Sequence, residues 1–252
     1  MTAQEKTQTI REKKGNRPIS ALTAYDYPTA RLLDEAGTDI LLVGDSLGMV
    51  VLGYPDTTHV TLEHIIHHSQ AVARGAKNAL IVSDLPINTY DTPEQAVASS
   101  RKLIAAGGQA VKLEGGVNQA EKVKAITDAG IPFMGHLGML PQRVKEEGGC
   151  KKKGKSDSEI EALLEGALSL QEAGAFAIVL ESVIPEASRR LTTELKIPTI
   201  GIGCGEKNCD GEIAVITDVI GSYPWFVPPF ATQRANVAAD ITKAVKGYLD
   251  SL

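Results

Sequence analysis

The chain has 252 residues, of which 43% are hydrophobic, and carries a formal net charge of −5. This length suits one large domain or two small ones, and α/β barrels often run this long as a single domain. The acidic balance and the lack of a long basic run in the sequence argue against a nucleic-acid-binding protein.

The N-terminal segment and the cysteines bear on the compartment. Residues 1–16 are polar and lack the apolar segment of a secretory signal, so we expect a short extension ahead of the domain. No stretch of sequence approaches the roughly 18 apolar residues that a membrane span needs. Cys150, Cys204 and Cys209 form neither a disulfide framework nor a CxxC pair, and we interpret Cys204 and Cys209 as plain thiols. We therefore predict a soluble, cytoplasmic protein.

Eight short β-like runs alternate with helical patterns along the chain. The predicted strands cover residues 18–24, 39–44, 79–83, 109–113, 131–135, 176–180, 198–202 and 224–227. Helix signals stand between several of them: Thr92, Asn118 and Ser158 are predicted N-caps, each with Glu or Gln three residues later. An Ala-Gly step ends four predicted helices, at Gly37, Gly107, Gly130 and Gly174.

The alternation of strands and helices implies a parallel sheet. Eight such units in 252 residues fit a (β/α)8 TIM barrel, with a doubly wound open sheet as the alternative. No linker rich in Pro, Gly or Ser divides the chain, so we predict that residues 1–252 form a single barrel domain. We interpret the polar stretch 141–158 as an active-site loop.

Four of the predicted strands lead directly into an acidic residue, namely Asp45, Asp84, Glu114 and Glu181. Asp and Glu make up 31 of 252 residues, so about one strand in eight should end this way by chance. In a TIM barrel the C-terminal ends of the strands form the active-site mouth. An acid after a strand can instead cap the next helix, and that alternative stays open for Asp26.

Several carboxylates that face one another cannot all stay charged without a cation. The sequence has no His or Cys cluster at metal spacing, and a site built from oxygen ligands favours Mg²⁺. Because Mg²⁺ keeps several waters, we expect Asp45 and Asp84 to be direct ligands and Glu114 to act through a water.

Two further polar residues belong to the predicted strands. Lys112 precedes Glu114 by two residues, so both side chains point to the same face. A lysine inside a barrel needs carboxylates or an anionic substrate; we prefer a substrate carboxylate, with a structural salt bridge as the alternative. His136 ends the fifth strand and is either a hydrogen-bonded core histidine or a substrate donor.

These motifs occur in an order that resembles the ketopantoate hydroxymethyltransferase family. The resemblance runs from "ISALTAYDYP" and "VGDSLGMVVLGYPDTTHV" through "SDLP", "AVKLEGG", "GHLGMLPQ" and "LES" to "GIGCG" and "CDGEIAV". It implies a TIM barrel of the phosphoenolpyruvate/pyruvate superfamily type. It also implies transfer of a hydroxymethyl group from 5,10-methylenetetrahydrofolate to 3-methyl-2-oxobutanoate, which gives 2-dehydropantoate (ketopantoate) in pantothenate biosynthesis through a Mg-stabilised enolate.

The resemblance further implies one Mg²⁺ per subunit, a homo-oligomer, typically a decamer, and a role for each site residue. The implied metal site comprises Asp45 and Asp84, with Glu114 on the water shell; the substrate contacts comprise Asp45, Ser46, Asp84, Lys112 and His136; and the catalytic base is Glu181. The chain departs from the family's pattern at Cys150, at Cys204 and over residues 224–229, which bears on loop closure and folate contacts.

Two other functions stay open at this point. The first is a Mg-dependent C–C lyase or mutase of the isocitrate lyase/PEP mutase type. Those lyases generally carry a Lys-Lys-Cys-Gly-His motif, which this sequence lacks. The second is a barrel without catalytic activity, which predicts a degraded mouth, whereas the acids, Lys112 and His136 are all present.

Overall fold

The computed structural model describes residues 1–146 and 148–252, which divide into two compact units, Met1–Ile213 and Ala214–Leu252. Each unit is considered by itself below. That residues 1–252 form one domain stays a prediction.

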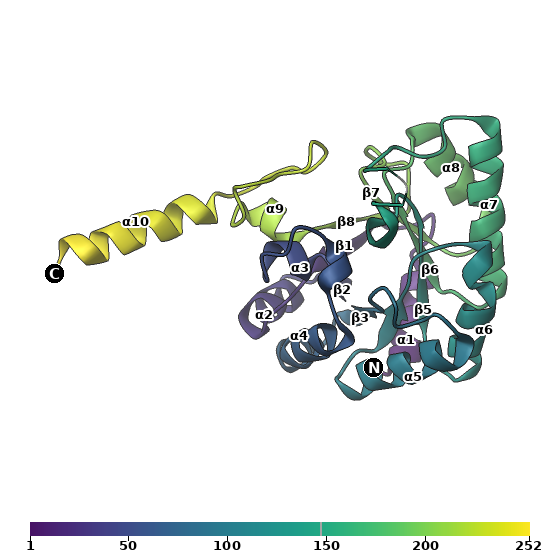
Figure 1. Cartoon of the computed structure of the whole chain (residues 1–252), viewed down its shortest axis with the longest axis horizontal. Coiled ribbons are helices and arrows are strands. Elements are labelled where there is room, and N and C mark those ends of the chain that lie inside the picture. Colours follow the sequence, from purple (N-terminus) through teal and green to yellow (C-terminus); the bar gives the residue numbers. More distant parts are fainter. Residues whose placement is uncertain (147) are drawn as a thin grey trace. The chain divides into compact units, whose positions relative to one another are not determined.

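Eight parallel strands close into a barrel in sequence order, which confirms the TIM-barrel prediction and excludes the open sheet (Figure 1). The strands are β1 (Ile19–Thr23), β2 (Ile40–Val43), β3 (Leu80–Asp84), β4 (Ala110–Lys112), β5 (Phe133–Gly138), β6 (Ala177–Glu181), β7 (Thr199–Ile202) and β8 (Gly211–Ala214). Apolar side chains from all eight strands, among them Leu42, Val82, Met134 and Val179, fill the interior as one buried cluster. The strand ends at the mouth are therefore held on a packed core.

Helices alternate with these strands along the chain. They are α1 (Ala3–Glu12), α2 (Tyr27–Glu35), α3 (Leu47–Val50), α4 (Leu62–Gly75), α5 (Pro93–Ala105), α6 (Ala120–Asp128), α7 (Asp157–Glu172), α8 (Pro185–Glu194), α9 (Ile216–Ile220) and α10 (Val237–Asp250), with 3₁₀ turns η1 (Thr57–His59), η2 (Val117–Gln119) and η3 (Pro141–Arg143).

The helix ends follow the local signals in part. The glycine of each of the four predicted Ala-Gly helix ends has a positive φ, which confirms that these helices end in the left-handed conformation. Thr92 accepts a hydrogen bond from the Gln95 amide at 3.2 Å and caps α5. The caps predicted at Asn118 and Ser158 are wrong, because η2 precedes α6 and because Ser156 caps α7, two residues earlier.

The N-terminal segment covers the end of the barrel opposite the mouth. Ile10 of α1 belongs to the interior cluster, and the buried Lys6 donates to Lys77 O, Ala79 O and Gln109 Oε1 at 3.1, 2.7 and 3.1 Å. Because residues 77–79 and 109 directly precede β3 and β4, α1 closes the N-terminal ends of these strands.

The eighth strand lies at 211–214, so the prediction of a strand at 224–227 is wrong. Residues 224–227 form turns and irregular structure. Three prolines, Pro224, Pro228 and Pro229, flank or enter this apolar run, and a proline cannot donate to a sheet ladder.

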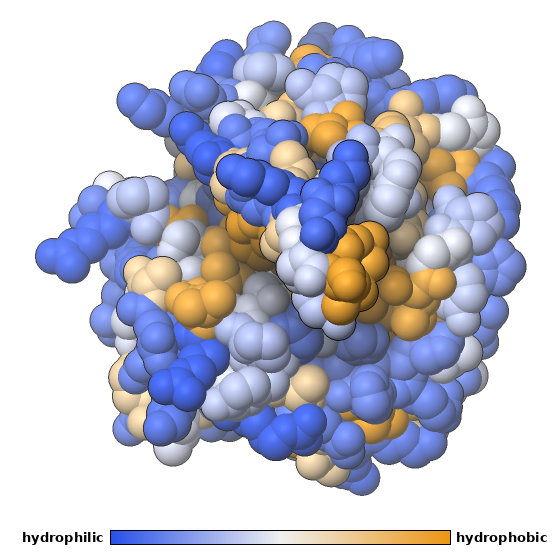
Figure 2. Space-filling view, turned by 90° about the vertical axis from the view of Figure 1, so that its left-hand side faces the viewer, coloured by the Kyte–Doolittle hydropathy of each residue, from blue (hydrophilic) through white to orange (hydrophobic). Residues whose placement is uncertain are grey.

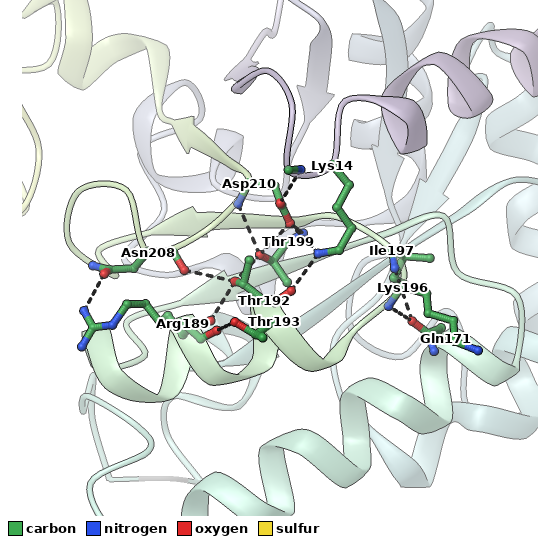
Figure 3. A network of polar contacts seen from close by, with 12 residues as sticks. Lys14, Gln171, Arg189, Thr192, Thr193, Lys196, Ile197, Thr199, Asn208 and Asp210 are labelled. Atoms are coloured by element: carbon green, nitrogen blue, oxygen red, sulfur yellow. Dashed lines mark hydrogen bonds and ion pairs between the residues drawn. The ribbon is translucent and has the colours of Figure 1, made fainter.

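A polar network fixes where β8 begins (Figure 3). Asp210, which directly precedes β8, accepts from Lys14 Nζ and from the Thr199 amide, both at 2.9 Å. Its carbonyl accepts from the Ile19 amide of β1 at 3.1 Å. Asp210 therefore joins the end of α1, the start of β7 and the start of β1, and it closes the barrel.

The second unit contains α9 and α10. Asn236 caps α10, and no residue of that helix is buried within the structure of a single chain. Large hydrophobic side chains are exposed in both units, and Figure 2 shows one face on which such groups lie among hydrophilic residues. In the part of the chain that the structure describes, no helix is long and apolar enough to cross a membrane.

Candidate functional site

The four acids predicted to face the mouth all lie at the C-terminal ends of barrel strands. Asp84 and Glu181 are the last residues of β3 and β6, while Asp45 and Glu114 follow β2 and β4 by two residues. Asp45, Asp84 and Glu114 are at most 5% exposed, and the Glu181 side chain is 14% exposed. Asp26, in contrast, caps α2 by accepting from the Thr29 amide at 2.8 Å, so its helix-cap interpretation is confirmed.

Lys112 is the cation of this cluster. It pairs in register with Asp84, and its Nζ lies 2.5 Å from Asp84 Oδ1. The other carboxylate oxygen, Asp84 Oδ2, accepts from the Asp45 amide at 3.0 Å. Burial disfavours a charged lysine, but the carboxylates of Asp84, Asp45 and Glu114 outweigh it and raise the pKa of Lys112, so the ammonium persists.

A single ammonium group faces four acids, and the pKa values of Asp45, Glu114 and Glu181 are raised. Burial, together with repulsion from Asp84, raises the pKa of Asp45 to about 7. Burial and the charge of Asp45 raise the pKa of Glu114 well above its usual range. These carboxyl groups therefore resist ionising together, and a bound cation would favour their charged forms.

The donor set fits a hard divalent cation. Asp84 Oδ1 and Glu114 Oε1 are buried oxygens without a hydrogen-bond partner among the described residues, although Asp84 Oδ1 faces the Lys112 ammonium. No three His, Cys, Asp or Glu side chains within residues 1–146 and 148–252 are grouped so that they alone could hold a metal. This arrangement matches an ion that takes one or two carboxylates and completes its shell with waters and substrate oxygens.

His136 joins the acids to the base candidate. Its Nδ1 lies 3.4 Å from Lys112 Nζ and 3.5 Å from Glu114 Oε1, and its Nε2 lies 3.2 Å from Glu181 Oε2. Burial and the Lys112 charge lower the pKa of His136 well below its usual value, so the ring is neutral. Because Nδ1 faces the ammonium as an acceptor, the ring proton lies on Nε2, toward Glu181.

Close packing of β5 against β6 holds this pair together. Gly138 has a φ of +101°, and a Cβ there would lie 2.2 Å from Glu181 O. The Met139 amide donates to the same carbonyl at 2.8 Å. Burial raises the pKa of Glu181 to about 7, which suits a general base near neutral pH.

Gln142 of η3 is a central residue that sequence reasoning did not single out. Its side-chain Nε2 donates to Asp45 Oδ2 at 2.8 Å and to Leu85 O at 3.1 Å. Its backbone amide donates to Glu114 Oε2 at 3.1 Å. Tyr90 OH in turn donates to Gln142 Oε1 at 2.5 Å. Gln142 thus orients two of the acids. The sequence signal that could have indicated it is its position just after Pro141, in the segment that follows the mouth end of β5.

Ser46 lies beside Asp45, at the start of α3. Its Oγ is 2.8 Å from Tyr25 OH, and the Tyr25 carbonyl is 2.5 Å from His68 Nδ1. The stretch 141–158 also reaches the mouth: the Lys153 amide donates to Ser182 O at 2.9 Å, next to Glu181. The predicted residues Asp45, Ser46, Asp84, Lys112, Glu114, His136 and Glu181 therefore gather at the same end of the barrel, while their individual roles stay predictions.

Comparison with known sequences identifies the family to which the chain belongs. The family model described as "Ketopantoate hydroxymethyltransferase" matches residues 4–252. The chain belongs to the ketopantoate hydroxymethyltransferase family. A relative named 3-methyl-2-oxobutanoate hydroxymethyltransferase from Dehalococcoides mccartyi (strain ATCC BAA-2266 / KCTC 15142 / 195) is 51% identical over 243 residues, covering 95% of this chain and 86% of the relative. One of the same name from Syntrophus aciditrophicus (strain SB) is 50% identical, covering 96% and 89%.

Solved structures place this ketopantoate hydroxymethyltransferase family member in a wider fold group. A putative phosphonomutase from Burkholderia cenocepacia J2315 matches with a TM-score of 0.69 and 18% identity, covering 98% of this chain and 99% of that one. A 2,3-dimethylmalate lyase, described as a PEP mutase/isocitrate lyase superfamily member, matches with a TM-score of 0.66 and 18% identity, covering 100% and 89%. These structures share the barrel fold of the chain, and the protein is a hydroxymethyltransferase by family.

Proposed function

We propose that this enzyme transfers the one-carbon unit of 5,10-methylenetetrahydrofolate to C3 of 3-methyl-2-oxobutanoate and so makes ketopantoate for pantothenate biosynthesis. The observation that carries the proposal is one buried mouth that combines a charged lysine, two close aspartates and a glutamate with a pKa of about 7. Since the sequence relatives are hydroxymethyltransferases, the lyase and non-catalytic alternatives are not retained.

Asp45 and Asp84 would hold one Mg²⁺, with Glu114 contacting it through a water. When bound, the ion would supply Lewis-acid stabilisation of negative charge on the ketone oxygen of the substrate. The support is the donor chemistry described above: oxygen ligands, the Asp84 carboxylate held by the backbone amide of Asp45, and Glu114 Oε1 without a hydrogen-bond partner among the described residues. Gln142 holds the Asp45 carboxylate in one orientation, as partners of metal ligands commonly do.

Lys112 and Ser46 would bind the carboxylate of the oxo acid. Lys112 is the ammonium group that this buried cluster offers to an anion, and it is anchored by Asp84 at 2.5 Å. His136, neutral and with its proton on Nε2, would donate a hydrogen bond at the reacting end of the substrate. Such fixed donors position the substrate without reorganising during the reaction.

Glu181 would remove the proton from C3, next to the ketone. Its buried carboxyl has a pKa raised to about 7, so it is both a stronger base than an ordinary glutamate and half ionised at neutral pH. The enolate left by this step forms a bond from C3 to the methylene carbon of the folate. Both C–N bonds of that carbon break, water supplies the hydroxyl group and the proton that the folate nitrogen needs, and tetrahydrofolate leaves. No covalent bond to the enzyme is required.

We also propose that the chain acts as a homo-oligomer, with the decamer of the family resemblance as the expected state. The hydrophobic residues Ile241, Val245 and Leu249 of α10, each at least half exposed in the single chain, support this proposal. Light scattering on the purified protein measures the mass directly. The cytoplasmic location stays a prediction.

The first half of the proposed reaction can be tested alone. The enzyme is incubated with 3-methyl-2-oxobutanoate in D₂O without folate, and exchange of the C3 proton is followed by NMR. We expect exchange with Mg²⁺ and a large loss of exchange after chelation. Equal exchange in both samples would contradict the metal-assisted mechanism.

A further inference from the structure

The loop between β7 and β8 brings two cysteines together that the sequence separates by five positions. The side chains of Cys204 and Cys209 lie close enough for each thiol to shift the pKa of the other. Both side chains pack on the bare backbone of Gly201, where a Cβ would lie 3.0 Å from Cys209 Sγ and 3.4 Å from Cys204 Cβ. The two sulfur atoms therefore form a pair rather than two isolated thiols.

The backbone of this loop is folded back on itself. Asn208 Nδ2 donates to Cys204 O at 2.9 Å, and Arg189 of α8 donates to Asn208 Oδ1 at 2.8 Å. Lys207 lies in the left-handed region with a φ of +59°. This turn holds Cys209 beside Cys204, so the pair is already assembled in the reduced protein.

The two thiols differ in reactivity. The hydrogen bond from Cys209 lowers the pKa of Cys204 to about 6 and raises the pKa of Cys209 above its usual value. The Cys204 thiol, which donates to Leu180 O at 3.1 Å, is therefore the more acidic of the two and the one that supplies the nucleophilic thiolate, while Cys209 keeps its proton. Cys204 is 3% exposed and Cys209 is partly exposed, so only a small oxidant would reach the pair.

The pair also contacts the segment that carries the base candidate. Cys204 Sγ lies 3.1 Å from Leu180 O, and the Ser182 amide donates to Ile202 O at 2.8 Å. Glu181 stands between these two attachment points. A change in the position of the Cys204 sulfur would therefore move the backbone at Glu181.

We propose that Cys204 and Cys209 form a reversible disulfide on reaction with hydrogen peroxide, and that this bond lowers the transferase activity. The Cys204 thiolate takes one oxygen atom from peroxide and becomes a sulfenic acid, and the released hydroxide becomes water on protonation. The Cys209 thiol then attacks that sulfur, which forms the S–S bond and releases a second water. The two thiols lose two electrons, peroxide gains them, and a dithiol such as dithiothreitol reverses the reaction.

A disulfide between Cys204 and Cys209 can be detected by tryptic digestion because Lys207 lies between the two cysteines. Trypsin cleaves after Lys196, Lys207 and Arg234, so each cysteine falls in its own peptide, 197–207 or 208–234. After peroxide treatment and alkylation of the remaining thiols, mass spectrometry should find these two peptides joined. The joined species should disappear after dithiothreitol and in Cys204→Ala. Recovery of both peptides as separately alkylated species would overturn the proposal.

The proposal that the disulfide lowers transferase activity rests on the proposed function, and it is tested separately by measuring that activity. The wild type and Cys150→Ala, a matched control at an exposed cysteine, should lose most of their activity on oxidation and regain it with dithiothreitol. Cys204→Ala should keep its activity under the same treatment. Joined peptides with unchanged activity would overturn the regulatory step. An enzyme inactive before any oxidation would count against the proposed reaction and leave the disulfide result standing.

Discussion

Replacing Glu181 by Gln separates binding from chemistry at this site. The amide keeps the size of the side chain and its reach toward His136 Nε2, 3.2 Å away, but it cannot accept the C3 proton. Loss of a general base typically costs about 10²–10⁴-fold in rate. We therefore expect kcat for C3–H exchange to fall by about this factor, while the KM for the oxo acid changes little, because the base acts in the transition state.

The pH dependence of C3–H exchange in the wild type is a second test of Glu181 as the base. With a pKa of about 7, the ionised fraction of Glu181 rises roughly tenfold between pH 6 and pH 8. The base is active when ionised, so kcat/KM for exchange should rise with pH across this range. In Glu181→Gln this rise should disappear from the residual exchange.

The assay follows loss of the C3–H signal of 3-methyl-2-oxobutanoate in D₂O by NMR, with saturating Mg²⁺ and no folate. Glu172→Gln, the same change at an exposed position at the end of α7, is the matched control and should exchange at the wild-type rate. Exchange at the wild-type rate in Glu181→Gln would refute the assignment. The next candidate would then be a water held by Glu114.

Three further changes test the other parts of the mouth. Asp84→Asn should weaken Mg²⁺ binding, measured by calorimetry, together with activity, and wild-type metal affinity in this variant would contradict its assignment as a ligand. Lys112→Ala should raise the KM for the oxo acid and lower the free energy of unfolding by about 3–5 kcal/mol, because it leaves Asp84 buried without its counter-ion; an unchanged KM would leave only the structural salt bridge. For both variants the exposed Lys124–Asp128 pair supplies the controls Lys124→Ala and Asp128→Asn, which should behave as wild type. Gln142→Ala should weaken Mg²⁺ binding or activity by about 10–100-fold, the range for partners of metal ligands, and an unchanged metal affinity and kcat would show that Asp45 needs no such partner.

The acids of the mouth could be predicted from sequence because a parallel barrel brings the C-terminal ends of all its strands to one rim. Asp84 and Glu181 needed only a buried strand ahead of them. The pairing of Lys112 with Asp84 was not predicted, because it depends on the register of β3 and β4; the sequence placed Lys112 at the mouth through its position two residues before Glu114. These features depend on local patterns of two to five residues, which a single sequence displays.

Features that depend on distant contacts were missed. The run containing Trp225 and Phe226 has the composition of a strand, yet β8 begins where Asp210 bonds to Lys14 and Thr199, residues that no local pattern links. Gln142 acquires its role only because β2, β4 and η3 meet at the mouth. The same reason applies to the contact between Cys204 and Cys209, which depends on how one loop turns.

Ketopantoate formation tests the central claim most directly. The purified enzyme is supplied with 3-methyl-2-oxobutanoate and 5,10-methylenetetrahydrofolate, with Mg²⁺ or with a chelator, and the product is quantified by mass spectrometry. The account predicts ketopantoate that requires the enzyme, both substrates and Mg²⁺. No product from the metal-loaded enzyme with both substrates, or the same yield with the chelator, would contradict it.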